Sequence, residues 1–177
     1  RVAQELGIGN PAVLGTLRDG DALFANAIRD RPVVLAFTSA RPPGPLPGAK
    51  AGFAVTGEDV TGNLRRIEAA TLPLPQLASA AGGLGLISLN LNQVGSRVRD
   101  VPLLMTDGTA LYPALALEAL RVALGASTYV VKGDPERAGA VEAIRVGEVS
   151  VPLNEHGELR FYAAPDDASS VIPKVGS

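Results

Sequence analysis

The chain has 177 residues, a formal net charge of −2 and no cysteine. This length fits one domain with a substantial buried core, and the near-neutral charge gives no electrostatic reason to expect binding to nucleic acid or to an anionic membrane. The lack of cysteine excludes a disulfide scaffold, a thiolate zinc site and a thiol nucleophile. Apolar stretches such as Leu84–Leu91 are far shorter than the ~20 residues of a membrane-spanning helix.

The first ordered pattern predicts a helix followed by a strand. Asp19 and the apolar spacing of the residues after it predict a capped helix over Asp21–Arg29. Pro32 ends this helix, and the continuous apolar run Val33–Phe37 is typical of a buried strand in a parallel sheet. This segment therefore reads as half of an α/β unit.

Proline and glycine dominate the next segment. The prolines within Arg41–Gly48 remove backbone donors, so residues 39–61 are predicted to be an irregular loop. A short helix over Gln76–Ala81 follows and ends at the glycine pair Gly82-Gly83.

A β-hairpin is predicted from residue 84 to residue 105. Its arms would be Leu84–Asn92 and Arg97–Met105, with a two-residue turn at Val94-Gly95. In this register one face is apolar, which argues against a slip of one residue.

The opposite face of this hairpin carries the candidate ligand-binding residues Asn90, Asn92, Arg97 and Arg99. The turn places Asn92 opposite Arg97 and Asn90 opposite Arg99. Two guanidinium groups beside two amides suit a carboxylate or a phosphate. The alternative is a solvated face, or arginines that pair with acids elsewhere in the fold.

The strongest helical pattern covers Tyr112–Leu124. Pro113 suits the first turn, and Gly125 suits the C-terminal cap. Its spacing predicts a buried stripe and places Glu118 and Arg121 on the wetter face. The predicted stripe is Leu117, Leu120 and Leu124.

The C-terminal third is predicted to be mainly β. A strand over Thr128–Val131 precedes a second hairpin over Ile144–Val151, and a further strand over Glu158–Tyr162 follows a polar turn. Residues 163–177 are predicted to be a mobile tail. Together these patterns predict one domain over residues 1–177 of mixed α/β (α+β) class, with a central mixed sheet, helices packed on it and two hairpins in the C-terminal half.

A search for catalytic patterns predicts a protein without chemistry of its own. The single histidine, His156, sits in a polar turn, which favours an exposed turn residue over a catalytic base. The glycines of Gly82–Gly85 precede a strand, whereas a phosphate-binding loop follows a strand and opens a helix. We expect no cofactor and no metal. A soluble α/β enzyme without a recognisable motif and a structural dimerisation module remain the alternatives.

Several segments, in their order along the chain, resemble the type-2 CHASE domain. The helix-and-strand segment and the later strand region, whose pattern is apolar–Pro–x–x–x–x–Gly–x–Leu, resemble the corresponding parts of that family. Together the segments cover about residues 19–162. They are Asp21–Phe37, Gly85–Asn90, Gly95–Leu104, Leu111–Arg121 and Val149–Tyr162.

The resemblance implies an extracytoplasmic (periplasmic) sensory domain of a bacterial membrane receptor. Such domains precede membrane-spanning helices in adenylate or guanylate cyclases, histidine kinases and related receptors, and read a small-molecule or protein signal. Asn92–Gly95 stands where members commonly carry Asp-x-Asp-Gly, so a metal role of those acids is not implied here. The family's first and last strands have no counterpart, so we expect a piece of a longer protein. Pairing of two copies, a homodimer, would cover the sheet edges left open.

Overall fold

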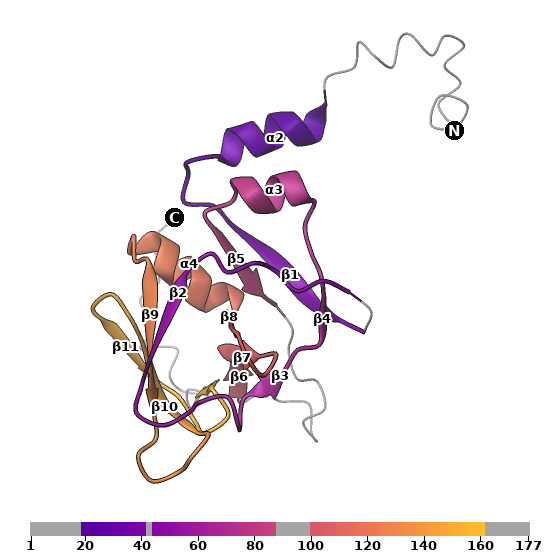
Figure 1. Cartoon of the computed structure of the whole chain (residues 1–177). Helices are drawn as coiled ribbons and strands as arrows, with labels where there is room; N and C mark the ends of the chain where they lie inside the picture. The colour runs from indigo at the N-terminus through magenta and orange to yellow at the C-terminus, as the bar shows by residue number, and fades with distance from the viewer. Residues whose placement is uncertain (1–18, 42–43, 88–99, 162–177) are drawn as a thin grey trace, which may run out of the picture.

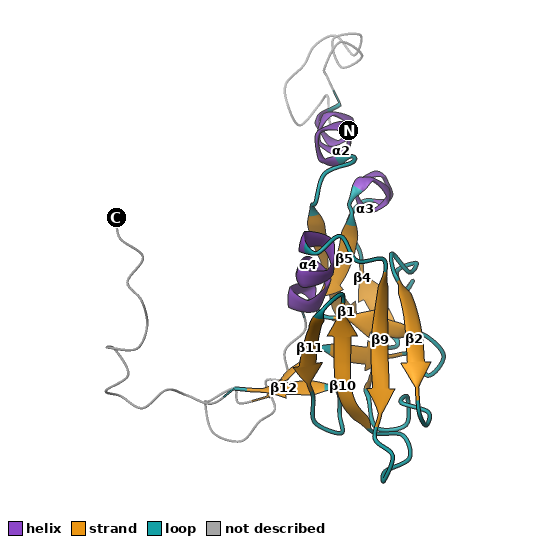
Figure 2. Cartoon of the chain, turned by 90° about the vertical axis from the view of Figure 1, so that its left-hand side faces the viewer, coloured by secondary structure: helices purple, strands orange, loops and turns teal. Residues whose placement is uncertain are grey.

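The computed structural model describes residues 19–41, 44–87 and 100–161, and these residues form helices and several small sheets (Figure 1). Two helices lie at one end of the molecule, and a third lies between two groups of strands (Figures 1 and 2). None of the described helices is long and apolar enough to cross a membrane. The predicted tail, residues 163–177, lies outside the described residues.

The two helices at the end of the molecule are α2 (Gly20–Ile28) and α3 (Pro75–Ala80). The Asp19 carboxylate caps α2 by accepting hydrogen bonds from the amides of Asp21 and Ala22, at 3.0 and 3.1 Å. This confirms the predicted cap and helix. The helices pack through apolar side chains, since Ala25 and Ile28 of α2 share a buried cluster with Ala80 of α3.

The predicted buried strand forms the centre of a three-stranded mixed sheet. Strand β1 (Val34–Ala40) pairs in parallel with β5 (Gly83–Leu86) and antiparallel with β4 (Ala69–Thr71). The parallel pairing with β5 is the arrangement that the apolar run of β1 predicts.

The second mixed sheet has four strands in the order β11-β10-β9-β2. Its members are β2 (Gly52–Thr56), β9 (Thr128–Gly133), β10 (Val141–Val146) and β11 (Val149–Pro152). Strands β10 and β11 form the predicted hairpin, with Val146 opposite Val149 across the turn. Inward residues of β9 and β10 are buried and belong to the largest core cluster of the described residues.

Strand β2 corrects one prediction. It lies within residues 39–61, which proline and glycine predicted to be irregular. The prolines end at Pro47, and the following segment pairs in parallel with β9, from Gly52 opposite Thr128 to Thr56 opposite Lys132. A partner so distant in sequence leaves no local signal at β2.

Two smaller sheets complete the fold. Strand β7 (Leu104–Thr106) lies between β3 (Arg65–Arg66), which is parallel to it, and β8 (Leu111–Pro113), which is antiparallel. Strand β6 (Asp100–Pro102) pairs antiparallel with β12 (Glu158–Arg160). The α+β class is therefore confirmed, and the strands of the described residues are divided among four sheets.

The predicted hairpin over residues 84–105 is wrong in its outer part. It required Leu84–Leu86 to face residues 103–105, whereas β5 pairs with β1, and β7 pairs with β3 and β8. The physical reason is that β5 finds a long apolar partner in β1, a contact that spacing within one short segment does not reveal. The central part of the predicted hairpin lies outside the described residues.

The helix α4 (Leu115–Ala123) starts later and faces differently than predicted. Tyr112 and Pro113 belong to β8, since they pair with residues of β7. The next residue continues this contact, because the Ala114 amide donates to the Leu103 carbonyl at 2.8 Å before the helix begins. Leu117 is buried as predicted, but Leu124 is 47% exposed. The inward face instead includes two charged residues.

Two glycines in β5 allow α4 to lie directly on the β1–β5 pair. A Cβ atom at Gly85 would come within 2.4 Å of the Leu115 Cα, and one at Gly83 within 2.5 Å of the Glu118 Oε1. Both contacts are closer than real Cβ atoms tolerate, so only glycine permits this helix–strand distance.

We predict that Gly85→Ala lowers the free energy of unfolding by roughly 1–3 kcal/mol, because the added methyl group overpacks a backbone contact. Urea unfolding followed by circular dichroism measures the change. Gly48→Ala is the matched control, since a Cβ atom there meets no heavy atom within 4 Å. Equal stabilities of the two variants would contradict the close approach of α4 to β5.

Candidate functional site

The four polar residues predicted as a ligand site, Asn90, Asn92, Arg97 and Arg99, lie outside the described residues. The anion-binding face therefore stays a prediction. His156 lies as predicted in an exposed turn, where its amide bonds to the Asn154 side chain at 3.0 Å. Its ring Nδ1 lies 3.1 Å from the Asn63 carbonyl oxygen.

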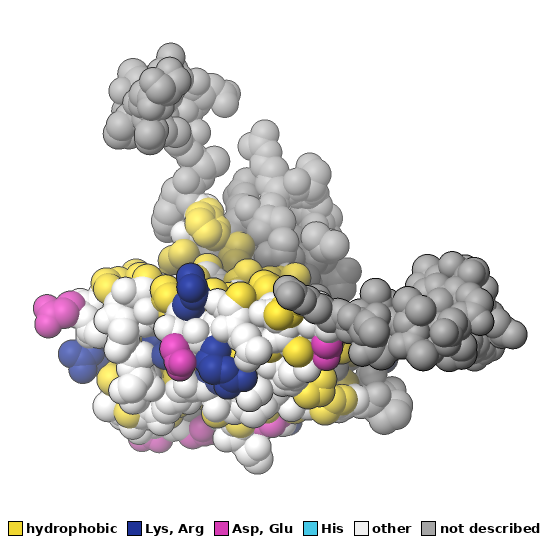
Figure 3. All heavy atoms as spheres, turned by 90° about the horizontal axis from the view of Figure 1, so that it is seen from above, with side chains coloured by type: hydrophobic (Ala, Val, Ile, Leu, Met, Phe, Trp, Pro, Cys, Tyr) yellow, Lys and Arg dark blue, Asp and Glu magenta, His cyan; other side chains and the backbone are white. Residues whose placement is uncertain are grey.

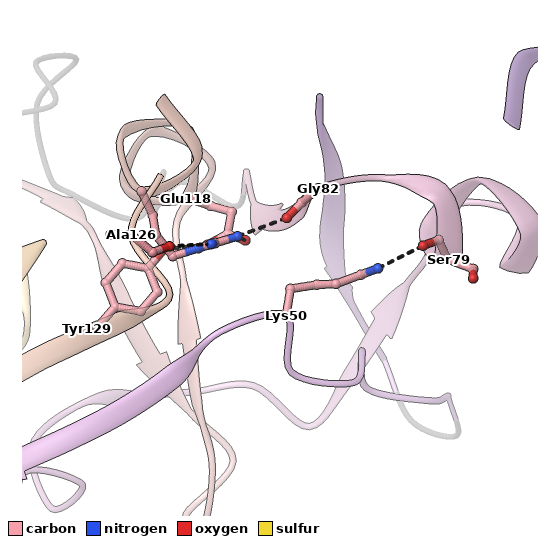
Figure 4. Close-up of polar contacts among 7 residues, drawn as sticks. Lys50, Ser79, Gly82, Glu118, Ala126 and Tyr129 are labelled. Carbon is pink, nitrogen blue, oxygen red and sulfur yellow. Dashed lines mark hydrogen bonds and ion pairs between the residues drawn. The ribbon is translucent and has the colours of Figure 1, made fainter. Parts of the chain in front are cut away.

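A buried polar cluster joins α4 to its neighbours (Figure 4). Its members are Glu118 and Arg121 of α4 and Tyr129 of β9, whose residues are 1%, 7% and 0% exposed. Glu118 and Arg121 were predicted on the wetter face, and that prediction is wrong. Charged residues are almost never this buried unless they are paired, so the cluster marks a specific local arrangement.

The Glu118 carboxylate holds Arg121 in a two-point contact. Arg121 Nε donates to Glu118 Oε2 at 2.9 Å, and Arg121 Nη2 donates to Glu118 Oε1 at 2.7 Å. The Tyr129 hydroxyl donates a further short hydrogen bond to Glu118 Oε2. The planar fork of arginine suits this geometry better than lysine would.

The same guanidinium group also bonds to two backbone carbonyls outside α4. Arg121 Nη1 donates to the Ala126 oxygen at 2.7 Å, and Nη2 donates to the Gly82 oxygen at 2.9 Å. Gly82 directly precedes β5, and Ala126 lies between α4 and β9. The cluster therefore connects the β1–β5 sheet with the sheet that contains β9 (Figures 1 and 4).

Burial and pairing shift the pKa values of two members of this cluster, Tyr129 and Arg121. Burial, reinforced by the hydrogen bond to Glu118, raises the pKa of Tyr129 well above its usual value. The hydrogen bonds that Arg121 donates to Glu118 raise the pKa of Arg121 as well. Both shifts favour the Tyr129 hydroxyl and the Arg121 cation at neutral pH.

A small pocket adjoins this cluster. Glu118 lies at its wall on α4, and Lys50 lies on the loop that forms another wall. Lys50 is exposed, and its Nζ donates to the Ser79 carbonyl at 3.1 Å (Figure 4). Most of the remaining lining is apolar, including Phe37, Phe53, Leu84, Leu111 and Tyr112.

The aromatic walls of the pocket are held in fixed positions. Phe53 stacks on Tyr129 with ring centroids 4.8 Å apart. The Tyr112 hydroxyl donates to Asp107 Oδ2 at 2.8 Å, and burial together with this bond raises the pKa of Tyr112 to about 12. Asp107 also accepts hydrogen bonds from the Thr109 and Ala110 amides, which lower its pKa. The lining is therefore largely apolar, with a few polar groups at its walls.

Residues 19–41, 44–87 and 100–161 contain no group of three or more histidine or acidic side chains placed to hold a metal ion. The described groups nearest the pocket are an exposed ammonium and a carboxylate whose two oxygens already accept hydrogen bonds.

Sequence reasoning missed this cluster because three-residue spacing of Glu118 and Arg121 is the usual pattern of an exposed helix pair. The signal that could have found it is the glycine at position 83, whose missing side chain makes room for Glu118. Recognising that signal requires knowing that β5 lies beneath α4.

A scan of protein-family models finds no match to this chain. Searches of curated proteins and of solved structures likewise find no significant match.

We predict that Arg121→Met lowers the free energy of unfolding by about 3–5 kcal/mol, because it leaves the Glu118 carboxylate buried without its partner. Lys132→Met is the matched control, since Lys132 and Glu142 form an exposed pair whose loss costs about 0–1 kcal/mol. Urea unfolding measures both changes. Equal losses in the two variants would show that the buried pair carries no special weight.

Proposed function

We propose that the chain is a signal-sensing domain of a bacterial transmembrane receptor, of the type-2 CHASE kind. It lies on the extracytoplasmic face of the inner membrane and controls a cyclase or histidine-kinase domain in the cytoplasm. In this proposal the domain performs no reaction itself. It reads a small-molecule or protein signal and passes on a change in its structure.

The arrangement of the resembling segments supports this proposal. Strands β1 and β5 pair with each other, and α4 packs on both. The segment around residue 86 also bridges to Ala114 at the start of α4, and β6 pairs with β12. The described parts of the segments that carry the family resemblance are therefore neighbours in space, as the parts of one functional unit should be.

The observation that carries the proposal is the buried link through α4. Arg121 bonds at the same time to Glu118 of α4, to the carbonyl before β5 and to the carbonyl before β9. A shift of α4 must therefore displace groups of two sheets together. A sensing domain needs such a connection between the surface that meets the signal and the surface that reports it.

In this proposal a signal molecule binds in the pocket beside this link. A molecule that binds more tightly to one position of α4 than to another shifts the population toward the first position. Lys50, Glu118 and Tyr112 are polar residues in its lining, and they come from three different elements or loops. A molecule bound in the pocket would thus contact Glu118 of α4 directly.

We predict that the domain lies outside the cytoplasmic membrane when the entire receptor is expressed in bacterial cells. The chain has no cysteine, and Ser150 is exposed on β11, so Ser150→Cys introduces one reactive thiol into this region. A membrane-impermeant maleimide should label the variant receptor in spheroplasts. The unsubstituted receptor measures the background from cysteines elsewhere.

Labelling that requires lysis of the spheroplasts would contradict the proposed location. The complete gene provides an independent test, because the proposal requires encoded membrane-spanning helices and a cyclase or kinase domain. A gene that encodes neither would overturn the proposal.

A further inference from the structure

We propose that the pocket beside α4 binds a small carboxylate ligand, whose apolar body lies against the aromatic walls and whose carboxylate pairs with Lys50. This inference rests on the proposed function, because it names the chemistry of the signal that the pocket would read. The location of the domain and the nature of its output are tested separately above.

The charges at the pocket do not cancel. Two charged side chains line it, the Glu118 carboxylate and the Lys50 ammonium. Glu118 is already neutralised, since Arg121 contacts its two oxygens at 2.9 and 2.7 Å. Within residues 19–41, 44–87 and 100–161, no acidic side chain forms an ion pair with Lys50. The lining and the partner of its carboxylate therefore carry one unbalanced positive charge.

The Lys50 ammonium has hydrogen-bonding capacity left for a ligand. An ammonium group has three donors, and one of them is used at the Ser79 carbonyl, 3.1 Å away (Figure 4). Ser79 belongs to α3, at the end of the molecule that Figure 3 shows from above, where a few charged side chains lie among hydrophobic ones. A ligand carboxylate can therefore accept from a second donor of Lys50 while the contact with Ser79 persists.

The third polar group of the lining adds no charge to this balance. The Tyr112 hydroxyl donates to Asp107 Oδ2 at 2.8 Å, so only its oxygen is left, as an acceptor. Asp107 itself is not part of the lining, and the Arg66 guanidinium lies beside it, with Nη1 3.4 Å from the Asp107 carbonyl oxygen. The charge of Asp107 is thus partly offset by its own neighbour.

This distribution of charge disfavours the other classes of ligand. A cation would meet the Lys50 ammonium and the guanidinium that already occupies the Glu118 carboxylate, and like charges at close range repel. A neutral polar ligand would leave the ammonium without a counterion. A carboxylate balances the charge and makes charge-assisted hydrogen bonds, which are roughly twice as strong as neutral ones.

The rest of the lining suits a compact apolar body. Phe37, Phe53, Leu84 and Leu111 line the pocket, and Phe53 is held by its stacking on Tyr129. In such sites apolar walls supply contact area, and the few polar groups set the orientation of the ligand. The pocket is small, so the body should be a single ring or a short alkyl chain.

The wall that carries Lys50 is also the wall that can yield to a ligand. The segment Gly48–Lys50 is exposed, and the hydrogen bond from Lys50 to Ser79 is the one that joins it to another element among the described residues. A Cβ atom at Gly48 would meet no heavy atom within 4 Å, so this wall is not closely packed. The aromatic walls on the strands are fixed by contrast.

Benzoate and benzamide test the class of ligand, because they share a ring and differ in the charge of the polar group. Titration of the isotope-labelled chain, followed by its backbone amide NMR shifts, gives both dissociation constants and the residues affected. We expect benzoate to bind about fivefold or more tightly than benzamide, since hydrogen bonds to charged groups contribute more than neutral ones. The shifts should include the lining residues Ala49, Ala51 and Leu111.

Variants of Lys50 test the residue that reads the charge. Lys50→Met should lower the affinity for benzoate to that for benzamide, and Lys50→Arg should restore most of the preference because it keeps the cation. Lys132→Met is the matched control, since it removes an exposed lysine outside the lining, and it should keep the preference. If Lys50 acted only by holding α3, its loss would weaken both probes alike. Thermal melting of each variant checks that it is folded.

Equal affinities of the two probes for the unsubstituted chain would overturn this class of ligand. The same conclusion would follow from shifts confined to residues outside the pocket, from a lack of binding by both probes, or from a preference for benzoate that survives in Lys50→Met. These outcomes leave the proposed location untouched, because maleimide labelling and the complete gene decide it. A gene without membrane-spanning helices would in turn overturn the sensory role and leave the preference for a carboxylate in place.

Discussion

The buried contact between Glu118 and Arg121 is the interaction on which the rest of the arrangement depends. Two charges removed from water are stable only when each is paired and its remaining hydrogen-bonding groups are satisfied. Here the carboxylate accepts from Arg121 and from Tyr129, and the guanidinium also reaches two backbone carbonyls. This requirement fixes the position of α4 relative to β5 and to β9.

Other features follow from that position. Position 83 must be glycine, because the Glu118 carboxyl occupies the space of a side chain there. Tyr129 must keep its hydroxyl, and Phe53 stacks against its ring on the neighbouring strand. The pocket lies where these groups and the loop around Lys50 meet. A polar link in the interior thus helps to fix the position of the pocket wall on α4.

Local sequence patterns predicted the elements whose causes are local. The Asp19 cap, the apolar run of β1 and the tight turn between β10 and β11 each act through residues near in sequence, and all three are present. The α+β class follows from the same signals. These local signals predict the elements themselves but not how the elements pack against one another.

The predictions that failed concern features that depend on residues far apart in the sequence. Strand β2 depends on a partner more than 70 residues away, and β5 pairs with β1 in place of the segment that follows it. The prediction for the inward face of α4 was wrong because its two charged residues find their partners outside the helix. Arg121 bonds to Gly82, and Glu118 bonds to Tyr129. Long-range contacts determine these features, and local patterns in a single sequence do not reveal such contacts. The predicted site at Asn90, Asn92, Arg97 and Arg99 stays untested, since it lies outside the described residues.

The central claim is that the Arg121 link makes the β1–β5 sheet and the β9–β10 sheet open as one cooperative unit. Native-state hydrogen exchange tests it most directly, because it gives an opening free energy for each protected amide. We expect the slowest amides of both sheets to share one value in the unsubstituted protein, and those of β1 and β5 to open at a lower value than those of β9 and β10 in Arg121→Met. Two sheets that keep a common value in Arg121→Met, or that differ already in the unsubstituted protein, would contradict the claim.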